Sequence, residues 1–298
     1  MAVVALVVFS LLYFTPGDPA AVIAGDVATD EDIRRIRATL GLDKPFFERF
    51  GAWVGALMRG DLGISIFTNL PVTRLIGQRI EPTLALTGCT LIVAVLIAVP
   101  FGVLAAARAG TWIDRSVMAF SVLGFSLPVF VVAYILIGIF SIHLEWLPVQ
   151  GYRSISEGFW PWLRHLILPS IALGTVYMAL IARITRASML DVLSQDYIRT
   201  AQAKGLSPDA VLYGHALKNA AVPIMTIVGI GIALLISGAI VTETVFAIPG
   251  IGRLTVDAIL RRDYPIIQGV ILLFSGIYVL INLAVDMSYV FFDPRIRY

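Results

Sequence analysis

Apolar runs long enough to cross a membrane alternate with polar segments along most of this chain. The first run, 2–14, has about thirteen residues, fewer than the roughly twenty that span a bilayer, so we expect a first transmembrane helix that is N-terminally short. The later runs are each long enough to cross with some tilt. They are 82–107, 116–142, 166–182, 222–246 and 266–292. The pattern predicts an all-α membrane protein with six transmembrane helices.

The segment 15–81 carries charges of both signs and is polar enough to lie outside the bilayer. Its proline- and glycine-rich start, 15–19, is expected to break the first helix. A short helix is expected to begin after Thr29 and to end at Gly41. A second, amphipathic helix is expected over 45–58, because its aromatic and aliphatic residues recur at helical spacing. Its apolar face either packs against the membrane domain or bilayer interface, or contacts an external partner.

These segments divide the chain into a first transmembrane helix at 1–14, an external segment with short helices at 15–81 and a five-helix core at 82–298. The basic residues of the short loops predict the orientation, because cytoplasmic loops are enriched in arginine and lysine. One set of loops carries Arg108, Arg115, Arg183, Arg186, Arg199, Lys204, Lys218, Arg295 and Arg297. The other set carries Arg153, Arg164, Arg253, Arg261 and Arg262. The richer set is expected in the cytoplasm, together with both termini.

The core contains a polar loop, 187–221, with an internal pattern of its own. Gly205 is suited to close one helix in the left-handed conformation. Ser207 followed by Pro208 is a common helix start, with serine as the cap and proline at the first helical position. The segment 196–219 is therefore predicted to form a helix, a sharp bend and a second helix. Such an element fits a groove on another protein, although an ordinary connecting loop has the same features.

Polar or helix-breaking residues inside the apolar runs are candidates for lining a transport pathway. Ser126 and Pro128 interrupt the third run, and carbonyl groups freed by a kink there need a neighbouring helix or water. Ser237 and Glu243 lie in the fifth run, where an ionisable group normally faces protein or water. Simple helix packing is an equally good account of the kink.

Composition and charge exclude several classes of protein. The chain is 58% hydrophobic and only 14% charged, which is far outside the range of soluble domains. A net charge of +2 without a basic run argues against a nucleic-acid partner. The single cysteine can form no internal disulfide, and the histidines are scattered over different loops, so no metal site is expected. No catalytic residues are expected. Because G-x-x-x-x-G-K-[ST] does not occur, any ATP must be hydrolysed by another subunit.

Short family-specific motifs are distributed over nearly the whole chain. In order they are Pro16-Gly17-Asp18-Pro19, Leu40-Gly41-Leu42-Asp43, Gly60-Asp61-Leu62-Gly63, Trp146-Leu147-Pro148, Arg199-Thr200-Ala201 with Gly205, His215-Ala216-Leu217-Lys218-Asn219, Glu243-Thr244-Val245-Phe246, Pro249-Gly250-Ile251-Gly252-Arg253-Leu254 and Arg262-Asp263-Tyr264-Pro265. Together they resemble the permeases of binding-protein-dependent ABC transporters, and most closely the first permease subunit of the dipeptide, oligopeptide, glutathione and nickel importers. The stretch 199–219 is similar to the cytoplasmic coupling loop of that family. Its Arg199-Thr200 departs from the general acidic-alanine start, as is usual in the peptide branch.

The resemblance implies a subunit of a transporter in the bacterial inner membrane. Relatives pair with a second homologous permease, dock two ATPase subunits that bind ATP and Mg, and receive ligand from an external substrate-binding protein. No cofactor is expected in this chain itself. The residues expected to couple to the ATPase are Arg199, Thr200, Ala201, Ala203, Lys204, Gly205, Leu206, Ser207 and His215.

Two other interpretations remain at this point. One is a secondary transporter or channel subunit that works without an ATPase. The other treats the helix, bend and helix as a DNA-binding turn, which the missing basic recognition face makes improbable. The resemblance leaves the substrate open among dipeptides, longer peptides, glutathione, nickel chelates and some sugars.

Overall fold

The computed structural model describes residues 1–14, 20–21, 29–39 and 42–292, and most of these are helical. The expected break at 15–19 and the expected helix end at Gly41 lie outside the described residues. The chain forms two compact units, Met1–Glu81 with Arg253–Tyr278 and Pro82–Gly252 with Val279–Tyr298. Each unit is described by itself.

The first unit contains the short helices of the predicted external segment. Its elements are α1 (Ala2–Phe14), α3 (Asp30–Thr39), α4 (Phe46–Leu57), α5 (Val72–Gly77), most of α13 (Ile251–Arg261) and the beginning of α14 (Tyr264–Phe292). The aromatic face of α4 packs on α1, because the Phe9 ring lies 5.4 Å from the ring of Phe50 and 5.2 Å from that of Trp53. This contact agrees with the packing interpretation of the amphipathic helix. Phe47 meets the Phe46 ring edge-on at 5.4 Å but is 82% exposed.

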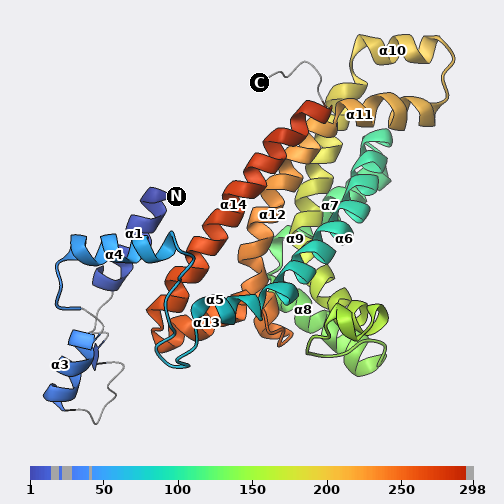
Figure 1. Ribbon diagram of the computed structural model, residues 1–298. Coiled ribbons are helices and arrows are strands. Elements are labelled where there is room, and N and C mark those ends of the chain that lie inside the picture. The colour runs from blue at the N-terminus through green and yellow to red at the C-terminus, as the bar shows by residue number, and fades with distance from the viewer. Residues whose placement is uncertain (15–19, 22–28, 40–41, 293–298) are drawn as a thin grey trace. The chain divides into compact units, whose positions relative to one another are not determined.

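The second unit is a helical bundle built around α9 (Figure 1). Its elements are α6 (Ile80–Ala107), α7 (Trp112–Ser126), α8 (Val129–Leu136), a π-helical segment (Ile137–His143), a 3₁₀ turn (Ile155–Glu157), α9 (Phe159–Leu193), α10 (Asp196–Ala203), a second π-helical segment (Ala210–Ala216), α11 (Leu217–Asn219) and α12 (Ala221–Val245). Helices α7, α8 and α12 pack on α9, whose fully buried side chains include Leu166, Leu173 and Met189. A Cβ at Gly102 of α6 would lie 2.7 Å from the Ala182 carbonyl of α9, so only glycine permits this approach.

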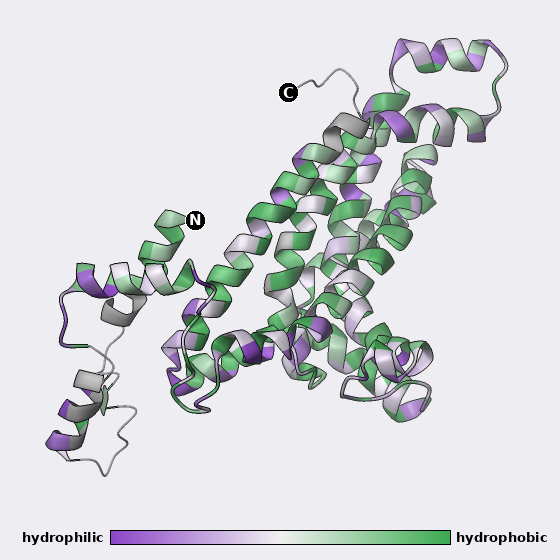
Figure 2. Ribbon diagram, in the orientation of Figure 1, coloured by the Kyte–Doolittle hydropathy of each residue, from purple (hydrophilic) through white to green (hydrophobic). Residues whose placement is uncertain are grey.

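Among the residues that the structure describes, three helical segments are long and apolar enough to cross a membrane: Val72–Ala107, Phe159–Leu193 and Tyr264–Met287. Two bent helix pairs raise the number to as many as five if each pair is one span. One of them, Trp112–Ser126 with Val129–His143, bends by 105° at the break that contains Pro128. The predicted kink in the third apolar run is therefore confirmed. Figure 2 shows the apolar residues along these helices and hydrophilic residues gathered on α10 and α11. The count of six spans stays a prediction.

Candidate functional site

The polar segment 196–219 folds as a helix, a tight turn and a second helix, as predicted. Helix α10 ends in a Schellman motif, in which Gly205 takes a left-handed φ of +80°. The Gly205 amide donates to the Gln202 carbonyl at 2.9 Å, and the Leu206 amide donates to the Ala201 carbonyl at 3.4 Å. Glycine is needed here because other L-residues pay about 1–2 kcal/mol for this conformation.

The second helix starts at the predicted serine. Its first residue is Pro208, and the Ser207 Oγ accepts a hydrogen bond from the Ala210 amide at 3.3 Å. The Ser207 carbonyl accepts from the Val211 amide at 3.0 Å. These bonds satisfy amides that a helix N-terminus otherwise leaves without partners. Both ends of the turn are thus fixed by local hydrogen bonds.

Buried apolar contacts make this segment a compact element, because Ile198 and Val211 face inward and are at most 3% exposed. The opposite surface is open, and Leu206 at the tip is 38% exposed. Every predicted coupling residue except Ala201 is exposed, including Lys204 beside the turn. Two further exposed residues, which the sequence pattern did not indicate, are Tyr197 and Tyr213. Figure 1 shows α10 beyond the end of the bundle where α9 ends.

An ion pair joins the two membrane helices α7 and α9 near this end. The Arg186 guanidinium donates from Nε to Asp114 Oδ1 at 2.5 Å and from Nη2 to Asp114 Oδ2 at 2.7 Å. Asp114 Oδ2 also accepts from the Gly110 amide at 2.9 Å. The aspartate side chain is 5% exposed and the arginine side chain 28%. From the sequence, Arg186 was identified only as a basic loop residue that indicates orientation, and Asp114 was not identified. The two residues are 72 positions apart, so their pairing could not be predicted from local sequence.

Replacing Asp114 with asparagine is expected to lower the free energy of unfolding by about 2–3 kcal/mol, because the half-buried guanidinium loses its bidentate partner. Thermal unfolding of the purified protein in detergent measures the change. The matched control is Asp191→Asn, which alters an exposed aspartate of α9. In a double-mutant cycle, Arg186→Gln should cost much less when Asp114 is already asparagine. Additive losses would show that the pair carries no coupling energy.

Glu243 near the end of α12 is fully buried and forms the centre of a polar cluster. The Thr83 hydroxyl donates to Glu243 Oε1 at 2.6 Å and accepts from the Ile251 amide at 2.8 Å. The Gly250 Cα lies so close that a Cβ there would overlap the carboxyl group. The Glu243 carbonyl accepts from the Ile248 amide at 2.8 Å. The Glu243 carboxyl group therefore ties α12 to the start of α6, and the Thr83 hydroxyl ties the start of α6 to the start of α13.

The other pathway candidates predicted from the sequence are Ser126, Pro128 and Ser237. Ser126 is exposed and donates to the Val122 carbonyl at 2.8 Å, whereas Pro128 is exposed at the start of α8. Ser237 belongs to α12, but its side chain lies outside the described set. Within the described part of the chain, no group of histidine, cysteine, aspartate or glutamate residues has the arrangement of a metal site.

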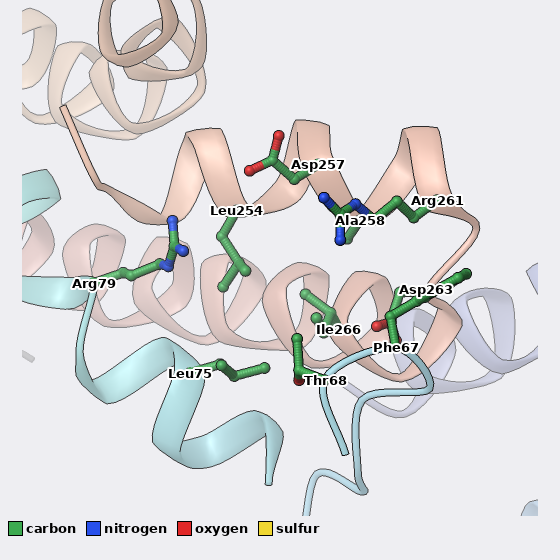
Figure 3. A pocket seen from close by; sticks show the side chains of 10 residues that line it. All are labelled: Phe67, Thr68, Leu75, Arg79, Leu254, Asp257, Ala258, Arg261, Asp263 and Ile266. Atoms are coloured by element: carbon green, nitrogen blue, oxygen red, sulfur yellow. The ribbon is translucent and has the colours of Figure 1, made fainter. Parts of the chain in front are cut away.

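The first unit holds a pocket of about 150 Å³ formed by α5, α13, the beginning of α14 and the loop before α5. Its lining includes two arginines and two aspartates, which Figure 3 labels as Arg79, Arg261, Asp257 and Asp263. Asp263, from the motif 262–265, is buried and accepts from the Ser65 hydroxyl at 2.6 Å and from the Ile66 amide at 3.3 Å. Its role in this unit is to hold the loop against the start of α14.

Comparison with known proteins shows the family. The profile of the "binding-protein-dependent transport system inner membrane component" matches residues 98–298, and the profile of the N-terminal part of such membrane components matches residues 1–87. The chain belongs to this family. It is therefore an ABC importer permease. In this family the permease is the membrane subunit of an ATP-driven importer and is not the catalytic subunit.

Several relatives of this permease match at full length. It is 57% identical over 100% of the chain and 95% of the relative to y4tP of Sinorhizobium fredii, a probable peptide ABC transporter permease protein. It is 44% identical to the glutathione transport system permease GsiC of Escherichia coli, over 99% of the chain and 94% of the relative. It is 42% identical to the dipeptide transport system permease DppB of Alkalihalophilus pseudofirmus, over 98% of the chain and 94% of the relative.

A solved structure has the same fold. The inward-facing MetNI methionine ABC transporter matches with a TM-score of 0.61 at 19% identity, over 74% of this permease and 97% of the matched chain. At this identity the likeness concerns the fold alone. It agrees with an arrangement of membrane helices that belongs to ABC importers.

Proposed function

We propose that this permease imports peptides or similar small solutes across the bacterial inner membrane. The full-length match to permeases named for peptide, dipeptide and glutathione transport carries the proposal. The substrate range follows the relatives, because these solutes share a peptide-like backbone. The permease forms half of the translocation pathway.

The other half belongs to a second homologous permease in the proposed assembly. Two ATPase subunits bind ATP and Mg on the cytoplasmic side, and an external substrate-binding protein delivers the solute. The chain supplies no cofactor site and contacts no nucleic acid in this proposal. Family membership supports ATPase and binding-protein partners, and the pairing of two different permeases follows the general pattern of the peptide importers.

The segment 196–219 is proposed to transmit the motion of an ATPase to the membrane helices. Its rigid turn at Gly205 and its exposed tip at Leu206 support this role. The proposed contact residues are Arg199, Thr200, Ala201, Ala203, Lys204, Gly205, Leu206, Ser207 and His215. Closure of the ATPases would move this element as a body and shift the spans between inward and outward openings.

The proposed topology has six transmembrane helices, both termini in the cytoplasm and the segment 15–81 outside. The excess of basic residues in the loops on the side of 196–219 supports this orientation. Ser126, Pro128 and Ser237 are proposed to line the pathway. Glu243 is proposed to hold its wall through Thr83.

Uptake by reconstituted vesicles tests the function. The complete complex of both permeases, the ATPases and the binding protein is reconstituted, and uptake of a labelled dipeptide and of labelled glutathione is measured. Uptake should require ATP and the binding protein. Uptake driven by an ion gradient in vesicles that lack the ATPases would identify a secondary transporter instead.

A further inference from the structure

The second unit contains a pocket of about 340 Å³ at the beginning of α9, within the size range of small-molecule sites. The loop after the third apolar run provides Glu145, and the first two turns of α9 provide Trp160, Arg164 and His165. Leu147 and two prolines complete the lining with apolar surface. The pocket thus combines a carboxylate, a guanidinium, an imidazole and an indole.

The two opposite charges of this pocket are not joined to each other. Neither Glu145 nor Arg164 takes part in an ion pair within the described residues. The Arg164 Nη2 donates to the Trp146 carbonyl at 2.6 Å, which leaves the other guanidinium donors for a ligand. Unlike Glu145, Glu157 of the same loop has an ion-pair partner. Its hydrogen bond from Arg153 at 2.8 Å holds the pKa of its carboxyl below the ordinary value. A ligand with one anionic and one cationic group would satisfy Glu145 and Arg164 together.

The position of the pocket along α9 favours a lipid as that ligand. Phe159–Leu193 is one of the segments able to cross the membrane, so its first turns lie at the level of the lipid headgroups. Phe159 and Trp160 are each 62% exposed there, as aromatic residues of a membrane interface are. The N-terminus of this long helix also favours a bound phosphate.

The backbone of Glu145 gives independent support. Its φ of +54° is a left-handed conformation that is unfavourable for glutamate, and such strain concentrates at binding sites. The neighbouring His165 has Nδ1 at 2.7 Å from the Pro161 carbonyl. The pocket therefore offers the Glu145 carboxylate as an acceptor for an ammonium group beside the Arg164 guanidinium as a donor for a phosphate.

We propose that this pocket binds the headgroup of phosphatidylethanolamine. The Arg164 guanidinium binds the phosphate, and the Glu145 carboxylate accepts hydrogen bonds from the primary ammonium. Phosphatidylcholine is a poorer ligand because its quaternary ammonium has no N–H to donate, and phosphatidylglycerol has no cation. The proposal does not depend on the identity of the solute.

Native mass spectrometry of the full-length permease, in detergent with dioleoyl lipids of each headgroup, tests the proposal. Wild-type protein should retain phosphatidylethanolamine in preference to the other two lipids. Glu145→Gln and Arg164→Gln should each reduce its retention about ten-fold, because each removes a charge-assisted contact.

The matched control is Arg108→Gln, which removes an exposed arginine that does not line the pocket. Glu145→Asn provides a second test, since asparagine tolerates the left-handed backbone and lacks the charge. Equal retention of phosphatidylethanolamine by wild type and both Glu145 variants would overturn the proposal. Equal retention of phosphatidylcholine, or displacement of the lipid by a dipeptide, would also overturn it.

Discussion

Gly250→Ala is expected to lower the free energy of unfolding by about 3 kcal/mol or more. The added methyl group would overlap the Glu243 carboxyl group, which is fully buried. Overpacking of this kind typically costs about 1–3 kcal/mol. The displaced carboxylate would also lose its hydrogen bond from Thr83, which adds about 1–3 kcal/mol for a buried polar group without a partner.

Thermal unfolding in detergent measures this loss, and Gly88→Ala is the matched control. Gly88 lies within α6, and a Cβ added there would have no atom within 4 Å, so alanine should be neutral or slightly stabilising. Thr83→Val should destabilise through the same cluster, because valine can neither donate to Glu243 nor accept from Ile251. A Gly250→Ala protein that unfolds at the wild-type temperature would show that the cluster is dispensable.

Local features of the fold were predictable from the sequence because they depend on neighbouring residues. The turn at Gly205 and the cap at Ser207 follow from side chains within a few positions of each other. The start of α12 at Ala221 and its end at Val245 agree with the apolar run 222–246 to within one residue at each end. Hydrophobicity and helix-capping chemistry act over such short stretches, so one sequence is enough to predict them.

Partners that are distant in the sequence were not predictable in the same way. Glu243 was recognised as unusual in an apolar run, but its partner Thr83 is 160 positions away. The Asp114 and Arg186 pair required knowledge that α7 packs on α9. Proline at position 128 predicted a kink, whereas its angle of 105° depends on the packing of both halves of the helix.

The coupling proposal leads to the largest expected functional effect. Gly205→Trp should reduce ATP-driven uptake by at least about ten-fold. A ten-fold change corresponds to a loss of about 1.4 kcal/mol of coupling free energy. The structure gives two reasons: a non-glycine residue is strained at φ +80°, and a large side chain would project from the exposed tip. Membrane insertion and assembly should persist, because no atom lies within 4 Å of a Cβ at this position.

Gly60→Trp is the matched control for this variant. Gly60 also has a left-handed φ, of +77°, with no atom within 4 Å of an added Cβ, and it lies in the predicted external segment. Both variants therefore carry similar backbone strain, whereas only the Gly205 variant alters the proposed ATPase contact. Uptake and ATP hydrolysis are measured in the same vesicles, and ATP hydrolysis should continue without uptake in the Gly205 variant alone. Normal uptake by Gly205→Trp, or an equal loss in Gly60→Trp, would contradict a coupling role for this turn.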